Sequence, residues 1–184
     1  MMEYAGQTSF LSPDELKGLG LKRYGANVLI SRFARLYSVD RIEVGDNVRI
    51  DDFCILSGNI EIGSFVHISA YSAIYARELV RLMDYSGISP RVTIFSATDD
   101  FSGDYLIGPM APAGSTRLIS GPVTLEKFVQ IGASSVILPN LTIKEGSVVG
   151  AMGLVNKDLE AWGIYAGIPA KRIRERNKGL LRYV

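Results

Sequence analysis

The hydrophobic pattern of the chain repeats every six residues. Between Ile119 and Lys157 each sixth position is Ile, Leu or Val, and the residue four positions further on is small or aliphatic. A period of six fits neither an amphipathic helix nor an alternating strand. It predicts a hexapeptide β-helix, in which each hexapeptide makes one short strand and a corner, and three of them complete a triangular coil. The aliphatic side chains then point inward and form the core.

The same period extends towards the N-terminus, weakly at first and clearly from Val44. Residues 28–158 are therefore predicted to form about six coils. Three insertions interrupt the repeat, between these pairs of ladder residues: Leu36 and Val44, Ile74 and Leu82, and Ile94 and Ile119. Whole coils separate the insertions, so we expect all three to leave the same corner of the prism. The third is predicted to be a long external loop over residues 97–118, and loops of that length are commonly functional.

Two flanking segments lie outside the repeat, residues 1–27 and residues 159–184. Ser12 is followed by a proline and by Glu15, which is the pattern of a capping box at a helix start. We expect a short helix there that covers the open end of the prism. In the second flank, Pro169 suits a helix start, and the basic segment after it is predicted to form another short helix.

Composition limits the possible settings of the protein. Its 47% hydrophobic and 9% aromatic content suits a core of small branched side chains, and its net charge of +1 favours neither nucleic acid nor a membrane surface as partner. The single cysteine, Cys54, occupies a small-residue position of the repeat and is predicted to be a buried thiol in a reducing compartment. No apolar run approaches the roughly 18 residues of a membrane span, and Met1–Gly6 does not begin like a signal peptide. We expect a cytoplasmic protein without membrane insertion.

Specific stretches resemble a known family. The runs Val149–Asp158 and Tyr165–Ile173 resemble the hexapeptide-repeat acyltransferases, in particular the galactoside and maltose acetyltransferase branch. The stretches His67–Tyr75 and Tyr105–Pro109 are similar to acetyltransferases of surface-polysaccharide gene clusters, such as those that act on nucleotide-linked viosamine. The resemblance implies an all-β, left-handed parallel β-helix, against the usual right-handed crossover preference. It also implies a homotrimer with acetyl-CoA in clefts between adjacent subunits.

The chain departs from the galactoside branch at the catalytic base. That branch carries its catalytic histidine at the start of the long loop, where this chain has Asp99 and Asp100, and its frequent tryptophan before Ile131 is Gln130 here. The only histidine is His67, which the hexapeptide count places at an outward corner. Because an imidazole titrates near neutral pH, His67 is predicted to be the base that takes the acceptor's proton; a plain surface histidine is the alternative.

The remaining candidates concern substrate and cofactor. The two loop aspartates are expected to orient His67, bind sugar hydroxyls or hold a sugar ammonium group, unless they are only a solvated loop start. Tyr71, Tyr75 and Tyr105 are expected to contact the sugar or nucleotide base, with trimer packing as the alternative. The resemblance assigns acetyl-CoA to six residues: Ala133, Ala151, Asn156, Lys157, Lys171 and Arg172. Small alanines leave room for the pantetheine arm, although repeat geometry alone also explains them, and the last two bases would meet the phosphates.

Several other functional classes make different demands on the sequence. A zinc-dependent β-helix of the γ-carbonic-anhydrase kind needs several histidines, so we expect no metal. Serine acetyltransferases need an N-terminal helical domain that 27 residues cannot supply. An amine is more nucleophilic than a hydroxyl, so the missing loop histidine favours N-acetylation. The resemblance to the surface-polysaccharide enzymes implies that the acceptor is a nucleotide-linked amino-deoxysugar for O-antigen or other surface polysaccharide. A sugar O-acetyltransferase and a non-catalytic β-helix scaffold are the alternatives.

Overall fold

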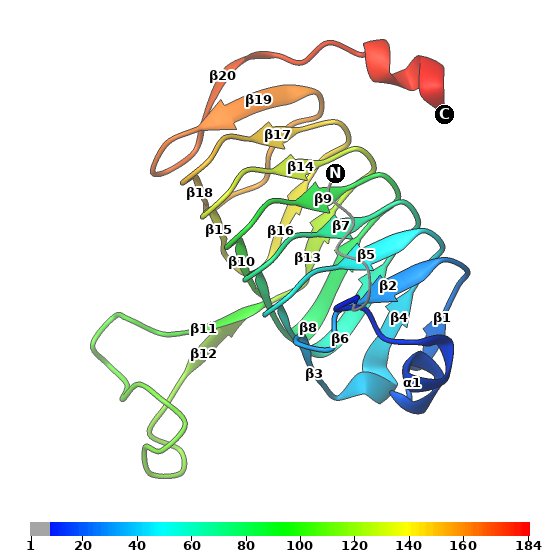
Figure 1. Ribbon diagram of the computed structural model, residues 1–184. Helices are drawn as coiled ribbons and strands as arrows, with labels where there is room; N and C mark the ends of the chain where they lie inside the picture. Colours follow the sequence, from blue (N-terminus) through cyan, green and yellow to red (C-terminus); the bar gives the residue numbers. More distant parts are fainter. Residues whose placement is uncertain (1–7) are drawn as a thin grey trace.

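Three strips of parallel strands form a triangular prism (Figure 1). The structure, a computed structural model, describes residues 8–184, so the Met1–Gly6 segment considered above lies outside the described residues. The chain is a left-handed parallel β-helix of about seven turns. The repeat predicted about six, because the last turn carries Tyr165 where the other turns carry an aliphatic residue, and its strand pairs in register with the one before it.

The strands fall into three faces. The first face contains β3 (Arg35–Tyr37), β10 (Thr93–Phe95), β15 (Val136–Ile137) and β18 (Leu154–Val155). The second contains β1 (Arg23–Tyr24), β4 (Ile42–Val44), β13 (Val123–Leu125) and β16 (Leu141–Ile143). Two long strands turn the corner and belong to both: β6 (Ile55–Ile62) and β8 (Ala73–Leu82). The third face contains β2 (Val28–Ile30), β5 (Val48–Ile50), β7 (His67–Ile68), β9 (Gly87–Ile88), β14 (Gln130–Ile131), β17 (Val148–Val149) and β19 (Gly163–Ala166).

The core is a set of stacked aliphatic ladders, as the repeat predicts. On the third face the inward residues of successive turns are Ile30, Ile50, Ile68, Ile88, Ile131 and Val149, all nearly inaccessible to solvent. Fully burying each such side chain stabilises the fold by about 1.5–3 kcal/mol before entropy is counted. Cys54 is a free, fully buried thiol, which confirms its predicted burial.

The corners are built from residues in the left-handed region of backbone conformation. Most are not glycine: Asn47, Phe65, Tyr85 and Phe128 line the corner between the second and third faces, and Phe53, Tyr71, Arg91, Ser134 and Met152 line the corner between the third and first. A side chain in this conformation costs about 1–2 kcal/mol. Stacking between turns offsets that cost, since the Phe65 and Tyr85 ring centroids lie 4.8 Å apart in nearly parallel planes.

All three insertions leave one corner, which confirms that prediction. This insertion corner lies between the first and second faces. It carries the 3₁₀ helix η1 (Val39–Arg41), the middle of β8 and a long arm. In the arm, β11 (Ala97–Asp99) pairs antiparallel with β12 (Leu118–Ser120), and the arm projects away from the prism in Figure 1. Ile119 was predicted to be a core ladder residue, and that is wrong: it lies in β12 and is half exposed.

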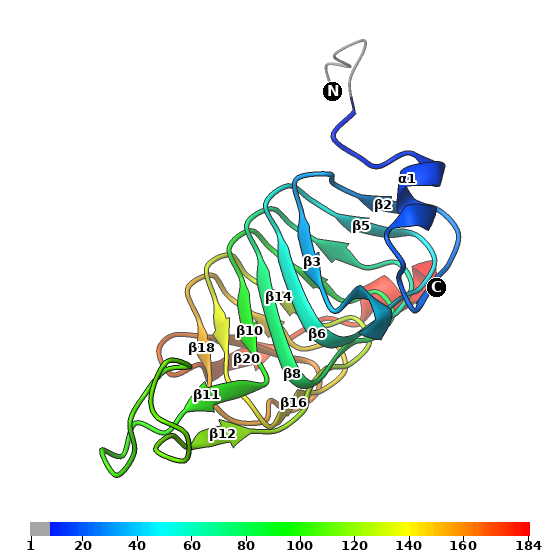
Figure 2. The same cartoon turned by 90° about the horizontal axis from the view of Figure 1, so that it is seen from below.

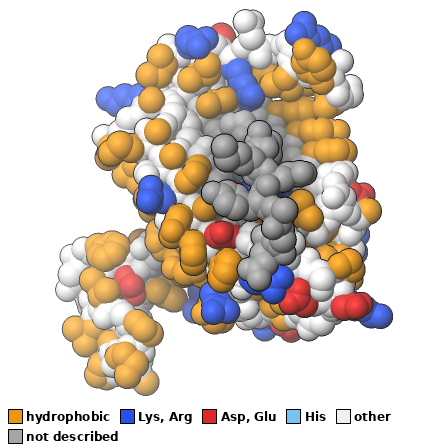
Figure 3. Space-filling view, viewed as in Figure 1, with side chains coloured by type: hydrophobic (Ala, Val, Ile, Leu, Met, Phe, Trp, Pro, Cys, Tyr) orange, Lys and Arg blue, Asp and Glu red, His pale blue; other side chains and the backbone are white. Residues whose placement is uncertain are grey.

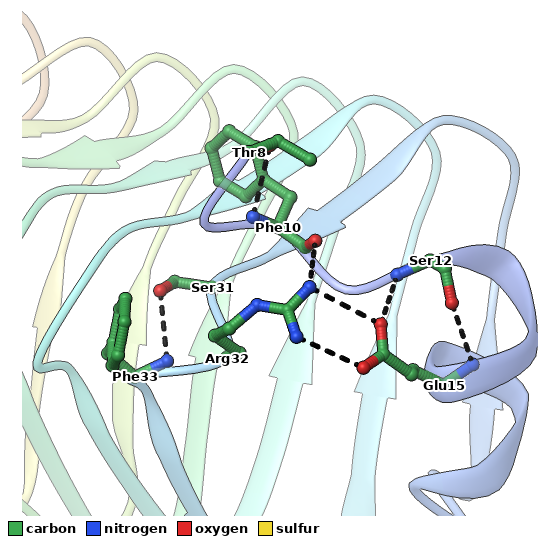
Figure 4. Close-up of polar contacts among 7 residues, drawn as sticks. All are labelled: Thr8, Phe10, Ser12, Glu15, Ser31, Arg32 and Phe33. Atoms are coloured by element: carbon green, nitrogen blue, oxygen red, sulfur yellow. Dashed lines mark hydrogen bonds and ion pairs between the residues drawn. The ribbon is translucent and has the colours of Figure 1, made fainter. Parts of the chain in front are cut away.

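The N-terminal end is capped as the sequence predicts. Helix α1 (Pro13–Gly18) starts with a complete capping box, in which the Glu15 N–H donates to the Ser12 hydroxyl at 3.3 Å and the Ser12 N–H donates to the Glu15 carboxylate at 2.8 Å. Arg32 holds the cap to the first turn of the prism by donating to Glu15 and to the Phe10 carbonyl oxygen (Figure 4). The helix thereby covers an otherwise open strand edge.

The C-terminal prediction of a basic helix after Pro169 is wrong. Residues Lys171–Glu175 form strand β20, antiparallel to β19, and only the 3₁₀ helix η2 (Gly179–Tyr183) follows. The last turn of the prism leaves unpaired backbone groups at its edge, and a strand satisfies them whereas a helix would not. The Arg176 guanidinium then fixes the segment by donating to the carbonyl oxygens of Phe128 and Gly146, at 2.7 and 2.9 Å.

Candidate active site

His67 lies in strand β7 on the outer surface of the third face. Its neighbour Ile68 points into the core, so strand alternation turns the imidazole outward, and half of the side chain is exposed. The predicted corner position is therefore wrong, because the corner of that turn falls at Phe65. In register, His67 stands between Arg49 of the previous turn and Gly87 of the next.

A carboxylate holds the imidazole in place. Oδ2 of Asp51 lies 2.8 Å from Nε2 of His67, and Nε of Arg49 donates to Oδ1 of Asp51 at 2.7 Å. Burial by itself would raise the pKa of Asp51, but the hydrogen bonds from Arg49 and His67 outweigh it and lower the pKa below the ordinary value. Asp51 therefore stays ionised at neutral pH and can orient His67 and stabilise its protonated form.

Sequence reasoning missed Asp51, although a signal was present. Arg49 precedes His67 by one full turn of the prism, and Asp51 lies two residues beyond Arg49 on the same outward side. Once the coil length is known, the sequence shows an acidic residue one turn before the only histidine, offset by two positions. Asp51 could therefore have been predicted from the sequence.

The edge between the third and first faces is here called the 3–1 corner. It runs from the pair Asp51 and His67 to the predicted cofactor residues. Successive turns bring Asp51, Ser69, Ser89, Gly132 and Gly150 one above another through backbone hydrogen bonds. Ala133 and Ala151 directly follow the two glycines and stack in turn, with the Met152 N–H donating to the Ala133 carbonyl oxygen at 2.8 Å. His67, Ser89 and both alanines therefore share one side of the prism.

The other four predicted cofactor residues divide between two places. Lys171 and Arg172 begin β20 next to the 3–1 corner, where Lys171 pairs with Ala166. Arg172 forms an ion pair with Glu175 at 2.6 Å. Asn156 and Lys157 are exposed after β18, at the opposite side of the first face from the two alanines. One extended ligand along the 3–1 corner would pass Ala133, Ala151 and Lys171 in sequence.

The arm positions the two predicted aspartates differently. The Asp100 carboxylate accepts from the Ser102 N–H at 2.8 Å and faces Arg117 at 3.7 Å, and the first of these contacts chiefly lowers its pKa. Asp100 thus holds the arm together. Asp99 accepts only a long hydrogen bond, 3.4 Å from the Gly108 N–H, and forms no ion pair with any residue from 8 to 184. Its carboxylate is the more available of the two.

The three predicted tyrosines lie on three separate parts of the molecule. Tyr71 stacks on Phe53 at the 3–1 corner. Tyr75 stacks on Phe95 on the first face, and Tyr105 lies in the arm under the Arg117 guanidinium. Within one chain neither arm aspartate contacts His67, whose carboxylate partner is Asp51.

Two properties of residues 8–184 bear on the site. No group of three or more His, Cys, Asp or Glu side chains is arranged to hold a metal ion there. None of the helices in that range is both long enough and apolar enough to cross a membrane.

Sequence relatives of the chain include two acyltransferases of Escherichia coli, although no protein-family model matches the chain. The dTDP-4-amino-4,6-dideoxy-D-glucose acyltransferase of Escherichia coli is 43% identical over 176 residues, which cover 94% of this chain and 92% of that protein. The galactoside O-acetyltransferase of Escherichia coli strain K12 is 29% identical and aligns with 91% of this chain and 85% of its own length.

Solved structures agree with these relatives. AntD, an N-acyltransferase from Bacillus cereus, superimposes with a TM-score of 0.94 at 45% identity over 96% of both chains, in a complex with dTDP and Coenzyme A. A hexapeptide-repeat acetyltransferase from Vibrio cholerae, at 20% identity and a TM-score of 0.65 over 91% of this chain and 80% of its own, shares the fold. The resemblance read from the sequence is thereby confirmed, and the chain belongs to the hexapeptide-repeat acyltransferases.

Proposed function

We propose that the protein transfers an acetyl group from acetyl-CoA to the amino group of a nucleotide-linked amino-deoxysugar. The observation that carries this proposal is the likeness to AntD, which was crystallised with dTDP-4-amino-4,6-dideoxyglucose and Coenzyme A together, at 45% identity over 97% of this chain. The curated relative from Escherichia coli is named for the same amino sugar. Both matches extend over the third face, the 3–1 corner and the arm.

His67 is assigned as the general base and Asp51 as its positioning partner. When a sugar amine attacks a thioester carbonyl, its nitrogen gives up a proton as the C–N bond forms and the C–S bond to CoA breaks, and an imidazole held by a carboxylate is suited to receive that proton. The thioester oxygen gains negative charge during attack, which backbone N–H groups can stabilise. The 3–1 corner brings the predicted pantetheine path to the same side of the prism as His67.

Asp99 is assigned to the sugar amine, and Ser89 to the reaction centre. Structures of AntD include single replacements of a serine and of an aspartate ten residues further along that chain. In the full sequence of the present protein, Ser89 and Asp99 are the only serine and aspartate with that separation in that order. Ser89 lies at the 3–1 corner one turn before Gly132, next to the expected thioester end of the cofactor.

A homotrimer would bring these groups together. Within one chain the first face separates Ser89 from Asp99, so a complete site needs the arm of a second copy. The arm carries unusually exposed apolar side chains, including Phe101 at 73% and Met110 at 94% exposure, and Figure 3 shows hydrophobic side chains gathered over it. Such a surface needs a protein partner to cover it. The arm of a neighbour lying along the 3–1 corner satisfies both needs.

The donor and the setting follow from the same likeness. AntD was also crystallised with 3-hydroxybutyryl-CoA, so acyl groups longer than acetyl are to be tested beside it. Acyl-CoA and nucleotide sugars are both intracellular metabolites, which supports a cytoplasmic location for the proposed reaction. The product would be an activated building block for O-antigen, the outer part of lipopolysaccharide, or for another surface polysaccharide.

The test measures release of the CoA thiol with matched acceptors. Acetyl-CoA is incubated with dTDP-4-amino-4,6-dideoxyglucose, its 4-hydroxy counterpart and a simple galactoside, and the series is repeated with 3-hydroxybutyryl-CoA. The proposal expects turnover with the amino sugar and little with the other two. Preferred turnover with the galactoside would instead support O-acetylation, as in the relative named for galactosides. Absence of acyl-CoA binding by calorimetry would leave only the scaffold interpretation.

A further inference from the structure

A slot for a flat ring interrupts a column of aromatic side chains on the first face. The outward positions of four successive turns carry Tyr37, Ser57, Tyr75 and Phe95, aligned by strand register. Figure 2 shows the four strands that carry them, β3, β6, β8 and β10, side by side. Tyr75 and Phe95 stack, with ring centroids 5.4 Å apart and planes 13° apart. Ser57, between Tyr37 and Tyr75, leaves a gap in the column where a ring would otherwise lie.

The spacing of the turns matches one inserted ring. Neighbouring strands lie about 4.8 Å apart, so Tyr37 and Tyr75, two turns apart, are separated by about 10 Å. Stacked aromatic rings have centroids about 4.5–7 Å apart, so one planar ring fits between two others at that distance. Both tyrosines are exposed, at 56% and 41%, and are open to a ligand.

Two arginines flank the slot at the insertion corner. Arg41 ends η1 and Arg77 lies in β8, and both line a hollow of about 270 Å³ together with Ser57 and Tyr75. Both side chains are exposed, and neither forms an ion pair with any residue from 8 to 184. Gly58 also lines the hollow, and its backbone passes so close to the next turn that a Cβ there would collide with the Ala76 carbonyl oxygen. Two guanidinium groups beside an aromatic slot suit a diphosphate joined to a flat base.

We propose that this slot binds the pyrimidine nucleoside diphosphate half of the acceptor, with the base between Tyr37 and Tyr75 and the diphosphate on Arg41 and Arg77. The inference rests on the proposed function, since it takes the acceptor to be a nucleotide sugar. Ala97, the first residue of the arm, also lines the hollow, and Asp99 lies two residues beyond it. A sugar attached to the diphosphate would therefore extend along the arm towards Asp99.

The experiment measures binding of dTDP and of thymidine to the whole protein by calorimetry. Ser57→Phe fills the slot with a ring of the protein's own, and Ser57→Ala is the matched control that leaves it open. We expect Ser57→Phe to weaken both ligands by about tenfold or more, and Ser57→Ala to bind both as the unchanged protein does. Tyr75→Leu removes one wall and is expected to weaken both ligands as well, which provides a second variant if Ser57→Phe does not fold.

Variants of the arginines distinguish binding of the phosphates from binding of the base. Arg77→Gln is expected to weaken dTDP by about tenfold while leaving thymidine nearly unchanged, because each charged hydrogen bond it removes is made to phosphate. Arg81→Gln is the control, since Arg81 lies on the second face in an ion pair with Glu61. Proton spectra add a direct readout: ring currents from two flanking tyrosines should shift the thymine methyl signal upfield, and Ser57→Phe should abolish that shift.

The outcomes distinguish this inference from the function on which it rests. If the unchanged protein binds dTDP and Ser57→Phe binds it equally well, the slot assignment is overturned and the nucleotide-sugar function stands. If the unchanged protein binds no dTDP while it transfers acyl groups to other sugars, both are overturned.

Discussion

Oδ2 of Asp51 lies 2.8 Å from Nε2 of His67 on the outer surface of the third face. The pair joins two successive turns of the prism, and Arg49 fixes the second carboxylate oxygen from the side. The only histidine of the chain is thus held by a carboxylate, which is an arrangement suited to a general base. It also stands near the 3–1 corner that carries Ser89, Ala133 and Ala151.

Replacement of His67 by alanine is expected to lower kcat by about 10²–10⁴-fold, because the acceptor's proton then has no positioned base. Asp51→Asn keeps the shape of the partner but removes its charge, so a smaller fall in kcat and a changed pH profile are expected. The measurement is thiol release against pH, with KM determined for both substrates.

The matched control is Arg81→Gln on the second face, which should leave kcat unchanged. Activity of His67→Ala within a few-fold of the unchanged protein would remove His67 as the base. The catalytic role would then pass to the group of Ser89 and Asp99.

Asp51 also predicts a pH dependence of stability. Its folded-state pKa lies below the ordinary value of 3.8, so its ionised form stabilises the fold above that pH, and the contribution is lost as the pH falls through the folded-state pKa. Asp51→Asn is expected to reduce the free energy of unfolding by about 1 kcal/mol near neutral pH, and by much less in acid below the folded-state value. Urea unfolding of both proteins at the two pH values measures the difference. A difference that grows in acid would contradict the assigned sign.

A bulky side chain at the 3–1 corner should obstruct the cofactor. Ala151 is exposed and is stacked on Ala133, so Ala151→Phe is expected to raise KM for acetyl-CoA by about tenfold or more without changing dTDP binding. Ala26→Phe, an exposed corner position at the opposite end of the prism, is the control and should leave KM unchanged. Equal KM values for the two variants would place the pantetheine path elsewhere.

The core ladder can be tested within one strand. Leu125 in β13 is fully buried between turns, so Leu125→Ala is expected to lower the free energy of unfolding by about 2–5 kcal/mol. Its neighbour Thr124 points outward, and Thr124→Ala should change stability by about 0.5 kcal/mol at most. Chemical unfolding monitored by circular dichroism measures both. Similar losses in the two variants would mean that the alternation assigned to β13 is wrong.

The period of six was enough to predict the prism, its ladders and the shared corner of the insertions. Each follows from the narrow interior, whose inward positions before the last turn admit only small or aliphatic side chains. The same pattern misplaced Ile119, because it precedes Leu125 by one period while its backbone pairs with β11 in the arm. The spacing of hydrophobic residues predicts which side of its strand a residue faces. It does not predict which other strand pairs with that strand.

Less of the candidate site could be predicted from the sequence. Asp51 meets His67 only through the stacking of turns, and the hexapeptide count placed His67 at a corner rather than in β7. The basic segment after Pro169 was predicted from its own sequence to be a helix. It forms a strand instead, because it pairs with the open edge of β19. The proposed approach of Asp99 to Ser89 would require a second copy of the chain, which the hydrophobic pattern of one chain does not predict.

The most direct test of the proposed function identifies the product. The protein is incubated with acetyl-CoA and dTDP-4-amino-4,6-dideoxyglucose, and the nucleotide sugar is examined by mass spectrometry before and after mild alkali. We expect a gain of one acetyl group that resists alkali, because an amide at the sugar nitrogen is stable where an ester is hydrolysed. An unchanged nucleotide sugar, or an acetyl group that alkali removes, would contradict N-acetylation of this acceptor.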